Sequence, residues 1–375
     1  MDNKLCVYAI CKNEIDNVAQ WIDNMSEADY IVVLDTGSTD GTYEVLKNDP
    51  RVTKVKQKII NPWRFDVARN ESMKLVPKDA NILLCTDFDE RFTTSGWANL
   101  IKSNWTEDTW RGHYLYIWSH TNIGNAGDAF WYDKLHTRKY KWVFPVHEVL
   151  CPIEGMDTMN QEYEGHLIEF NDSIILEHYP DENKTRDYLN LLHLRLEENP
   201  EDSYSYFLLG REYGILNDYN NCIKYFEEAL NLEDIKYRKL TEYCILGYLG
   251  DIYASLGNLS LSAYYYNRQI EKDPTYREPY FNLADIYNRL RLYETAITFV
   301  KAGIERSFRH YDWTERSICW NGMADDLLSV SYYYLNLPRE GLSHAIKALQ
   351  FDPMNERIQK NYLALLELIN KVSEE

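Results

Sequence analysis

The sequence predicts an α/β domain with a mostly parallel sheet in residues 1–190, followed by an all-α repeat domain in residues 191–375. Up to about residue 180, short apolar strands alternate with helical patterns, and this alternation is typical of parallel sheets. From Asn199 onward the apolar pattern is wholly helical and repeats along the chain. A chain of 375 residues is also long enough to form two hydrophobic cores.

The first half contains segments with the apolar patterns of strands and of helices in turn. In residues 13–25, Ile15, Val18, Trp21 and Ile22 stand at helical spacing. Because a βαβα order makes strands parallel, we expect helices to cover both faces of their sheet. The expected strands span residues 5–10, 30–34, 52–60 and 82–85, with later strands of the same sheet at 114–119 and 141–149, and the expected helices span residues 13–25, 39–46 and 66–75.

The second half carries a repeated helical pattern. Residues 206–213 read Tyr-x-x-Leu-Gly-x-x-Tyr and precede an Ala-Leu pair at 229–230, which is the spacing of a tetratricopeptide repeat. The pattern recurs at 246–253 and 280–287, and in a degenerate form at 325–349. Copies in register argue against an irregular helical domain. Proline, which stops a helix, marks the repeat junctions at Pro200, Pro274 and Pro353.

Repeat arrays present extended surfaces, and their end helices have no neighbour on one side. We therefore expect this half to present a surface to a peptide or protein, or to build a homodimer. The last expected helix, residues 355–372, has an apolar stripe, which predicts either a cap on the array or a dimer contact. The stripe consists of Ile358, Tyr362, Leu365, Leu366 and Ile369.

Charge and composition argue against several classes of function. The formal net charge of −19 opposes a nucleic-acid partner, because binding to a phosphate backbone needs basic clusters. No apolar run approaches the roughly 20 residues of a membrane-spanning helix, and the strand-like pattern begins directly after Lys4, so no signal peptide is expected. The seven cysteines are scattered without a Cys-x-x-Cys pair, which predicts buried thiols in a reducing cytoplasm.

Acidic residues follow the apolar strand at 82–85, in the sequence Asp87-Phe88-Asp89. Open α/β sheets bind ligands at the carboxyl ends of their strands. Closely spaced carboxylates suit a divalent cation that also holds a phosphorylated ligand. Other polar segments close expected strands or open helices, and they contain Asn13 and Glu14, Asp35 with Ser38 and Asp40, Asp66 with Arg69, and His147 with Glu148.

A crevice lined by these residues suits a nucleotide. Asp35 would accept hydrogen bonds from the base or ribose, Asp87 would lie near the ribose, and Asp89 would bind a metal ion that bridges the diphosphate. Each motif also has a simpler explanation. Ser38 and Asp40 fit a helix cap, Arg69 fits a surface ion pair, and His147 fits a buried core histidine. The occurrence of all the motifs in this order favours a shared site.

Together the motifs resemble those of the family 2 glycosyltransferases, which have the GT-A fold. The whole chain resembles their bacterial subgroup with C-terminal tetratricopeptide repeats, which includes the S-glycosyltransferases that modify bacteriocin peptides. One departure is Phe88, where a small residue is common, so we expect Phe88 to alter the packing of the sugar pocket. The matching segments are Lys12-Asn13-Glu14, Asp35-x-x-Ser38-x-Asp40-x-Thr42, Phe65-Asp66-x-Ala68-Arg69-Asn70, Asp87-x-Asp89-Glu90, His147-Glu148, and His178-Tyr179 with Lys184 and Arg186.

The resemblance implies an inverting transfer of a sugar from a nucleotide-diphosphate sugar, a UDP-hexose or UDP-N-acetylhexosamine, to a peptide, protein or glycan acceptor. It implies Mg²⁺ or Mn²⁺ bound by Asp89, His178 and Asp87. Glu148 is the expected catalytic base, and His147 is the alternative base or orients Glu148. The implied residues for binding the nucleotide sugar are Asn13, Glu14, Asp35, Ser38, Asp40, Asp66, Arg69, Asp87, Phe88, Lys184 and Arg186.

Two other functions compete with this interpretation. The first is a catalytically inactive scaffold whose repeats bind a peptide or protein partner. The second is a sugar nucleotidyltransferase, which shares the sheet type. The segment Cys11-Lys12-Asn13-Glu14 lacks the glycine- and arginine-rich loop expected after the first strand of such an enzyme.

Overall fold

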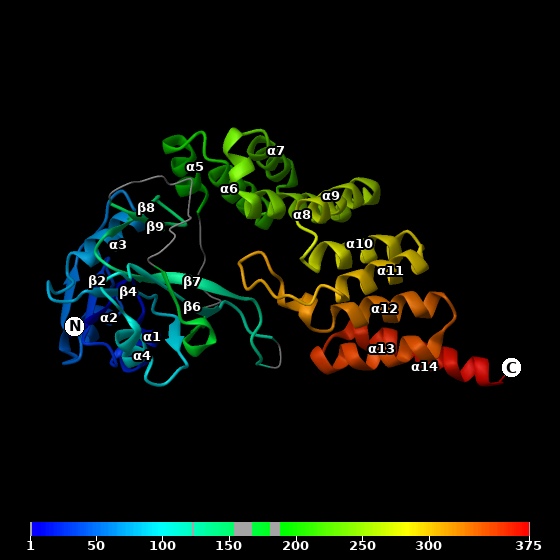
Figure 1. Cartoon of the computed structure of the whole chain (residues 1–375), viewed down its shortest axis with the longest axis horizontal. Helices are drawn as coiled ribbons and strands as arrows, with labels where there is room; N and C mark the ends of the chain where they lie inside the picture. The colour runs from blue at the N-terminus through cyan, green and yellow to red at the C-terminus, as the bar shows by residue number, and fades with distance from the viewer. Residues whose placement is uncertain (1, 122–123, 154–166, 181–187, 375) are drawn as a thin grey trace. The chain divides into compact units, whose positions relative to one another are not determined.

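The computed structural model describes residues 2–121, 124–153, 167–180 and 188–374 (Figure 1). The chain forms two compact units. The sheet unit consists of Met1–Ser119 and Phe130–Glu212, and the repeat unit consists of His120–Ala129 and Tyr213–Glu375. The boundary at Glu212 falls within a helix, Ser203–Ile215.

Four parallel strands form one half of the nine-stranded sheet, in the order β3-β2-β1-β4. The inner strands are apolar and almost wholly buried, as expected for strands covered on both faces. The edge strand β3 instead carries exposed lysines. The predicted alternation is confirmed here by β1 (Leu5–Cys11), α1 (Ile15–Met25), β2 (Tyr30–Asp35), α2 (Thr42–Asn48), β3 (Lys54–Gln57), α3 (Phe65–Met73) and β4 (Ile82–Cys85).

The other half of the sheet is mixed. β7 (Ala129–His136) runs antiparallel to β4, and β5 (Glu90–Phe92) runs antiparallel to β11 (Ile175–His178). The sheet as a whole is therefore only partly parallel, and β7 is a strand that the sequence pattern did not predict, because Asp133 and Lys134 interrupt its apolar run. In the same half, β6 (Arg111–Ile117) pairs in parallel with both β10 (Leu167–Glu169) and β11. The helix α4 (Trp97–Asn104) follows β5 in the chain.

The segment expected as one strand at 141–149 is not part of this sheet. It splits into β8 (Tyr140–Val143) and β9 (Val149–Pro152), which form a separate antiparallel pair. The chain reverses between them at residues 144–148, hereafter the hook. Phe144 and His147 in the hook have positive φ angles of 79° and 47°, which are uncommon for non-glycine residues. Apolar residues lie on both sides of the reversal, so the sequence pattern predicted one continuous strand and did not indicate the turn.

Alternate residues of β1 face two hydrophobic layers. Val7 and Ala9 pack in a cluster that includes Trp21 of α1. Tyr8 packs on the opposite side in a cluster that includes Trp142 of β8. All seven cysteines are buried and form no disulfide, which agrees with the predicted core role. The strand ends that carry the polar motifs are therefore anchored in a packed core.

The helical part follows the predicted repeats. Figure 1 shows the pairs α8/α9, α10/α11 and α12/α13 stacked in order, and α9 packs on α10 as α11 does on α12. The three prolines lie in the gaps after α5, α9 and α13. The helices are α5 (Leu189–Glu198), α6 (Ser203–Ile215), α7 (Tyr219–Leu230), α8 (Lys239–Ser255), α9 (Leu259–Lys272), α10 (Glu278–Arg289), α11 (Tyr293–Ile304), α12 (Met323–Tyr334), α13 (Pro338–Phe351) and α14 (Glu356–Glu374).

The final helix, α14, packs on α13. Ile358 and Leu365 of its apolar stripe are buried, and a Cβ atom on Gly341 of α13 would lie 2.6 Å from Cδ2 of Leu365. The stripe thus caps the array, while a dimer contact stays a prediction. None of the helices within the described ranges is long and apolar enough to cross a membrane.

Gly250 of α8 allows the close approach of Tyr266 on α9. A Cβ atom at Gly250 would lie 2.4 Å from Cε1 of Tyr266, whose ring is held by a hydrogen bond from its hydroxyl to Asp251 (2.5 Å). We predict that Gly250→Ala lowers the free energy of unfolding by about 1–3 kcal/mol, because overpacking outweighs the better helix propensity of alanine. Urea unfolding followed by circular dichroism measures this change.

The control for this experiment is Ser260→Ala, at an exposed position of the neighbouring helix α9. We expect it to change the free energy of unfolding by less than about 0.5 kcal/mol. A Gly250→Ala protein as stable as the control would contradict the packing described for α8 and α9.

Candidate active site

The parallel strands bring several predicted site residues to one edge of the sheet. β1 and β2 are in register to their last residues, Cys11 and Asp35, and β4 ends beside β1. The loops that follow these strands therefore start from the same edge. Asp87 and Asp89 lie in the turn between β4 and β5, and β5 begins opposite His178 at the end of β11.

Asp35 is fully buried at the end of β2. Its Oδ1 accepts hydrogen bonds from the backbone N–H groups of Gly37 and Ser38 and from Nε2 of Gln57, all at 2.9 Å. Burial raises the pKa of Asp35, but the hydrogen bonds from Ser38 and Gln57 outweigh burial and lower it below its usual value. Asp35 is therefore an ionised acceptor at neutral pH.

Asn13, Ser38 and Asp40 join the loop after β1 to the loop after β2. The backbone N–H of Asn13 donates to Oγ of Ser38 (2.8 Å), and Asn13 Oδ1 accepts from the N–H of Thr39 (2.8 Å). Asp40 accepts from the N–H groups of Ile15 (3.1 Å) and Thr42 (3.0 Å), at the starts of α1 and α2. Ser38 and Asp40 thus brace the loops, and neither is the N-cap residue of α2, which is Gly41. Nearby, Glu14 accepts from Asn17 Nδ2 (3.0 Å).

Arg69 lies at the centre of a buried ion network. It is 5% exposed, so the surface ion pair considered from the sequence is wrong. Its Nη2 lies 3.0 Å from Asp87 Oδ1, and its Nε donates to Oε1 of Glu148. Lys134 on β7 continues the network, because its Nζ lies 2.7 Å from Asp87 Oδ2 and 3.1 Å from Glu90 Oε1. Two cations thus hold three carboxylates in fixed positions.

The charges in this network set its protonation states. Burial alone raises the pKa of Asp87, but Arg69 and Lys134 outweigh burial and hold that pKa well below its usual value. Burial lowers the pKa of Lys134, but Asp87 and Glu90 outweigh burial and raise it well above its usual value. For Glu90 burial dominates, so its pKa is raised. Asp87 and Lys134 are therefore both charged at neutral pH.

Lys134 was missed by the sequence reasoning. It is 4% exposed and contacts Asp87 directly, yet it lies within a strand without a recognisable motif. The signal in the sequence is a lysine beside apolar residues in an extended segment, since a fully buried lysine is rare unless it is paired. That signal does not identify its partner.

Asp89 and His178 face each other across the start of β5 and the end of β11. His178 Nε2 lies 3.4 Å from Asp89 Oδ2, and their side chains are 6% and 16% exposed. His178 Nδ1 lies 3.2 Å from the carbonyl oxygen of Trp118, which only accepts, so Nδ1 carries a proton. Burial lowers the pKa of His178, but the hydrogen bond to Asp89 and its charge outweigh burial and raise it.

This pair fits a divalent cation that takes its other ligands from a diphosphate. Within the described residues, no group of three or more His, Cys, Asp or Glu side chains is arranged to hold a metal ion. Mg²⁺ and similar cations are, however, often held by one or two protein ligands together with substrate phosphates and water. The hydrogen bond from His178 Nδ1 to a carbonyl orients Nε2 as metal-binding histidines require. Both oxygens of Asp87 are bonded to Arg69 and Lys134, so of the three expected ligands Asp89 and His178 are the two that could hold such an ion.

His147 and Glu148 lie in the hook between β8 and β9. Oε1 of Glu148 is bonded to Arg69, whereas Oε2 has no hydrogen-bond partner within the described part of the chain. His147 is half-buried, and its Nε2 lies 3.0 Å from Nη2 of Arg211 on α6. His147 is thus a bonded residue at the edge of the site and not a core histidine.

Two residues predicted to bind the donor, Phe88 and Asp66, contact other side chains of the protein. Phe88 is 2% exposed and stacks on Trp21 at 4.3 Å between ring centroids, inside the hydrophobic core. Phe88 therefore packs in the hydrophobic core, and its expected effect on a sugar pocket stays a prediction. Asp66 is largely buried and forms an ion pair with Arg64 at 2.9 Å. Lys184 and Arg186 lie outside the described residues.

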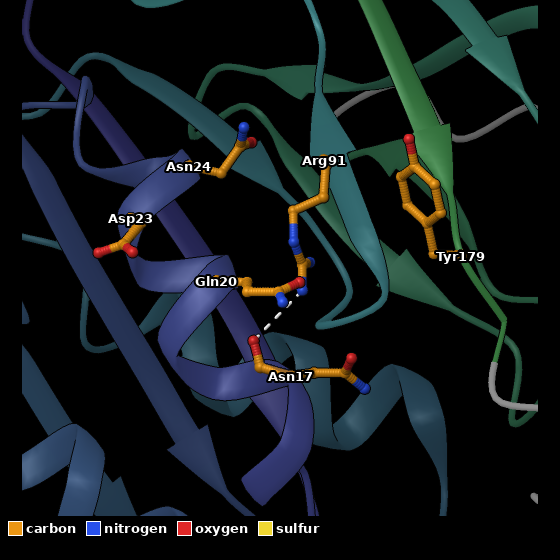
Figure 2. Close-up of a pocket in the computed structure, with 6 residues that line it drawn as sticks. All are labelled: Asn17, Gln20, Asp23, Asn24, Arg91 and Tyr179. Atoms are coloured by element: carbon orange, nitrogen blue, oxygen red, sulfur yellow. Dashed lines mark hydrogen bonds between the residues drawn. The ribbon is translucent and has the colours of Figure 1, made fainter.

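A pocket of about 650 Å³ opens beside the turn that carries Asp89. Arg91 crosses from β5 toward α1, and its guanidinium donates to the carbonyl oxygens of Phe88 (2.6 Å), Glu90 (2.7 Å) and Asn17 (3.2 Å), the last drawn in Figure 2. Arg91 thereby ties the turn to α1. The pocket is lined by Asn17, Gln20, Asp23 and Asn24 of α1, by Arg91, and by Tyr179, which follows His178.

Comparison with known proteins identifies the repeats. The tetratricopeptide repeat family matches residues 203–234 and 278–310. No curated protein matches the chain. Several solved structures are similar to part of this chain. TTC0263, a tetratricopeptide protein of Thermus thermophilus, is 18% identical, with a TM-score of 0.35, and covers 48% of this chain and 88% of its own.

Two further solved structures have similar sequence identities and TM-scores. MamA of Desulfovibrio magneticus RS-1 is 14% identical, with a TM-score of 0.35, over 46% of this chain and 93% of its own. PilF of Pseudomonas aeruginosa is 12% identical, with a TM-score of 0.38, over 46% of this chain and 70% of its own. The family match and the helix pairs together establish that the C-terminal region of this chain contains tetratricopeptide repeats.

Proposed function

We propose that the protein transfers a sugar from a nucleotide-diphosphate sugar to an acceptor, with inversion at the anomeric carbon. The observation that carries this proposal is the gathering of carboxylates from separate strand–loop junctions at one sheet edge. Asp35, Asp87 and Asp89 come from the ends of β2 and β4, and Arg69 connects Asp87 to Glu148 of the hook. Such an edge is where open α/β sheets bind nucleotides.

The donor would be a UDP-sugar bound along the loops after β1, β2 and β4. Asp35 is ionised, and its Oδ2 accepts only a weak hydrogen bond from Sγ of Cys11 (3.5 Å), which an N–H or O–H group of a base or ribose would replace. Oδ1 of Asp87 is paired with Arg69 and keeps a second lone pair, which would accept a hydrogen bond from a ribose hydroxyl, while Oδ2 is paired with Lys134. Asn13, Ser38 and Asp40 keep the connecting loops in place.

The diphosphate leaving group would lie beside Asp89 and His178. Those two residues would hold Mg²⁺ or Mn²⁺, and the nitrogen ligand favours Mn²⁺, because Mg²⁺ takes mainly oxygen ligands. When bound, such an ion stabilises the negative charge that develops on the diphosphate. His178 is oriented for this by Trp118, and Asp89 by the hydrogen bond from Tyr179 N–H to its carbonyl oxygen (2.7 Å).

Glu148 is the proposed general base. Its Oε1 is fixed by Arg69, and its Oε2 has no hydrogen-bond partner among the described residues, so one oxygen is oriented and the other is available to an acceptor. A carboxylate held in this way takes the proton as the nucleophile attacks. The acceptor would be a peptide, protein or glycan hydroxyl, or a cysteine thiol.

A thermal-shift screen tests the donor. UDP-glucose, UDP-N-acetylglucosamine, UDP-galactose and GDP-mannose are each added with and without Mn²⁺. We expect a rise in melting temperature with at least one UDP-sugar that requires Mn²⁺ and is lost in Asp89→Asn, because ligands that bind only the native state stabilise it. No shift with any of the four donors would contradict the proposal.

A second candidate function is a peptide-binding scaffold without catalysis. The matched repeats at 203–234 and 278–310 favour it, since repeat arrays present extended binding surfaces. The same screen separates the two functions, because a scaffold needs no nucleotide sugar. The repeats would serve a peptide or protein acceptor under the first proposal and a partner protein under the second.

A further inference from the structure

The hook that carries His147 and Glu148 is held by arginines from the first two helices after the sheet. Arg195 of α5 is 2% exposed, and its Nη1 donates to the carbonyl oxygens of Val146 (3.0 Å) and His147 (2.9 Å). Its guanidinium also lies over the ring of Phe144 at 3.7 Å. The hook contains two residues with positive φ, so its shape depends on such outside contacts.

Arg211 of α6 makes a second contact with the hook. Its Nη2 lies 3.0 Å from Nε2 of His147. A guanidinium has no acceptor atom, so Nε2 must accept this hydrogen bond, and the proton of the neutral imidazole must then lie on Nδ1. Nε of Arg211 is buried without a hydrogen-bond partner among the described residues, and no ion pair of Arg211 is found there. Arg211 is thus directed at His147 and not at a carboxylate.

We propose that Arg195 and Arg211 are positioning residues that hold the hook and fix His147 as the Nδ1–H tautomer. This inference rests on the proposed function and extends it, because it separates the roles of two neighbouring candidates. Nε2 of His147 is engaged by Arg211 and does not take the acceptor proton. Glu148 takes that proton, and His147 keeps the hook oriented.

The inference also gives the first repeat helix a part in the site. α6 begins the first matched repeat, residues 203–234, while its residues up to Glu212 belong to the sheet unit. Arg211 lies in that part of α6. The helix that opens the tetratricopeptide array therefore supplies a residue that sets the hydrogen bonding of His147.

The first test reads the tautomer directly and does not depend on enzyme activity. The full-length protein is labelled with ¹⁵N-histidine, and the ring resonances of His147 are assigned by comparison with His147→Gln. In the wild type and in Arg211→Lys we expect an unprotonated Nε2 and a protonated Nδ1. In Arg211→Met we expect the Nε2 resonance to move, because its donor is gone, while Arg339→Met at an exposed position of α13 leaves it unchanged. A proton on Nε2 in the neutral wild-type ring would overturn the assignment.

The second test separates positioning from the proposed function. Turnover is measured as UDP release from the UDP-sugar that gives the largest thermal shift. Arg211→Met is expected to lower kcat by about tenfold or more while the donor KM changes less than about twofold, and Arg211→Lys is expected to recover most of the loss. Wild-type turnover in Arg211→Met, with turnover lost in Glu148→Gln, would refute the positioning role alone. Wild-type turnover in Glu148→Gln would instead refute the proposed base.

Discussion

Glu148→Gln is expected to abolish sugar transfer while UDP binding stays within about twofold of the wild type. The amide has nearly the same shape as the carboxylate and still offers Arg69 an oxygen acceptor, so the hook keeps its place. It cannot take a proton from the acceptor, and loss of a general base typically lowers the rate by about 10²–10⁴-fold. Turnover assays combined with calorimetric titration of UDP measure the two effects separately.

The matched control is Glu169→Gln at an exposed position of β10, for which we expect wild-type turnover. The size of the Glu148→Gln defect also reports on the acceptor. A thiol ionises nearer to neutral pH than a hydroxyl, so a cysteine acceptor predicts a smaller defect. A Glu148→Gln protein with unchanged turnover on a verified acceptor would place the base elsewhere.

Lys134→Met is expected to cost about 3–5 kcal/mol of folding stability at neutral pH, the usual loss when one partner of a buried ion network is removed. Lys134 is 4% exposed and lies within 3.1 Å of both Asp87 and Glu90. Its removal takes away the cation paired with the buried Glu90 and leaves Asp87, whose side chain is 34% exposed, with Arg69. Urea unfolding at neutral pH measures the loss. Lys78→Met, at an exposed position, is the control and should leave the free energy of unfolding unchanged.

The loss of folding stability caused by Lys134→Met should become smaller as the pH falls. The pKa of Asp87 is lowered in the folded protein, so its ion pairs add stability above the unfolded carboxyl pKa, and that stability is lost as the pH falls through the folded value. The pKa of Glu90 is raised, so Glu90 opposes folding increasingly as the pH rises through the folded value. Without Lys134 both carboxylates favour protonation. A deficit of equal size at neutral pH and near about pH 4 would contradict this network.

The parallel half of the sheet and the repeats were predictable because each has a strong local signal. The strands β1, β2 and β4 are continuous apolar runs between helical patterns, and the repeats recur in register with prolines at their junctions. The mixed half was not predictable in the same way. Apolar patterns do not encode the direction of a strand, so nothing in the sequence of β7 placed it antiparallel to β4.

The candidate site was predictable as a set of loops but not as a set of contacts. Asp35, Asp87 and Asp89 were placed at strand ends by their position after apolar runs. The contacts that these residues make were not predictable, because Lys134 is far from Asp87 in sequence and belongs to no motif. Phe88 is linked to a sugar pocket by the resemblance alone, whereas its stacking on Trp21 is a tertiary contact that only the packed core reveals.

The most direct test of the site uses Mn²⁺ as a spectroscopic probe in the presence of UDP. Electron–nuclear double resonance on the Mn²⁺ complex should show coupling to ³¹P of the diphosphate and to ¹⁴N of an imidazole. The nitrogen coupling should disappear in His178→Ala, and Asp89→Asn should weaken binding of the complex. A spectrum identical to that of Mn²⁺ and UDP free in buffer would contradict the claim that Asp89 and His178 hold a cation on a bound diphosphate.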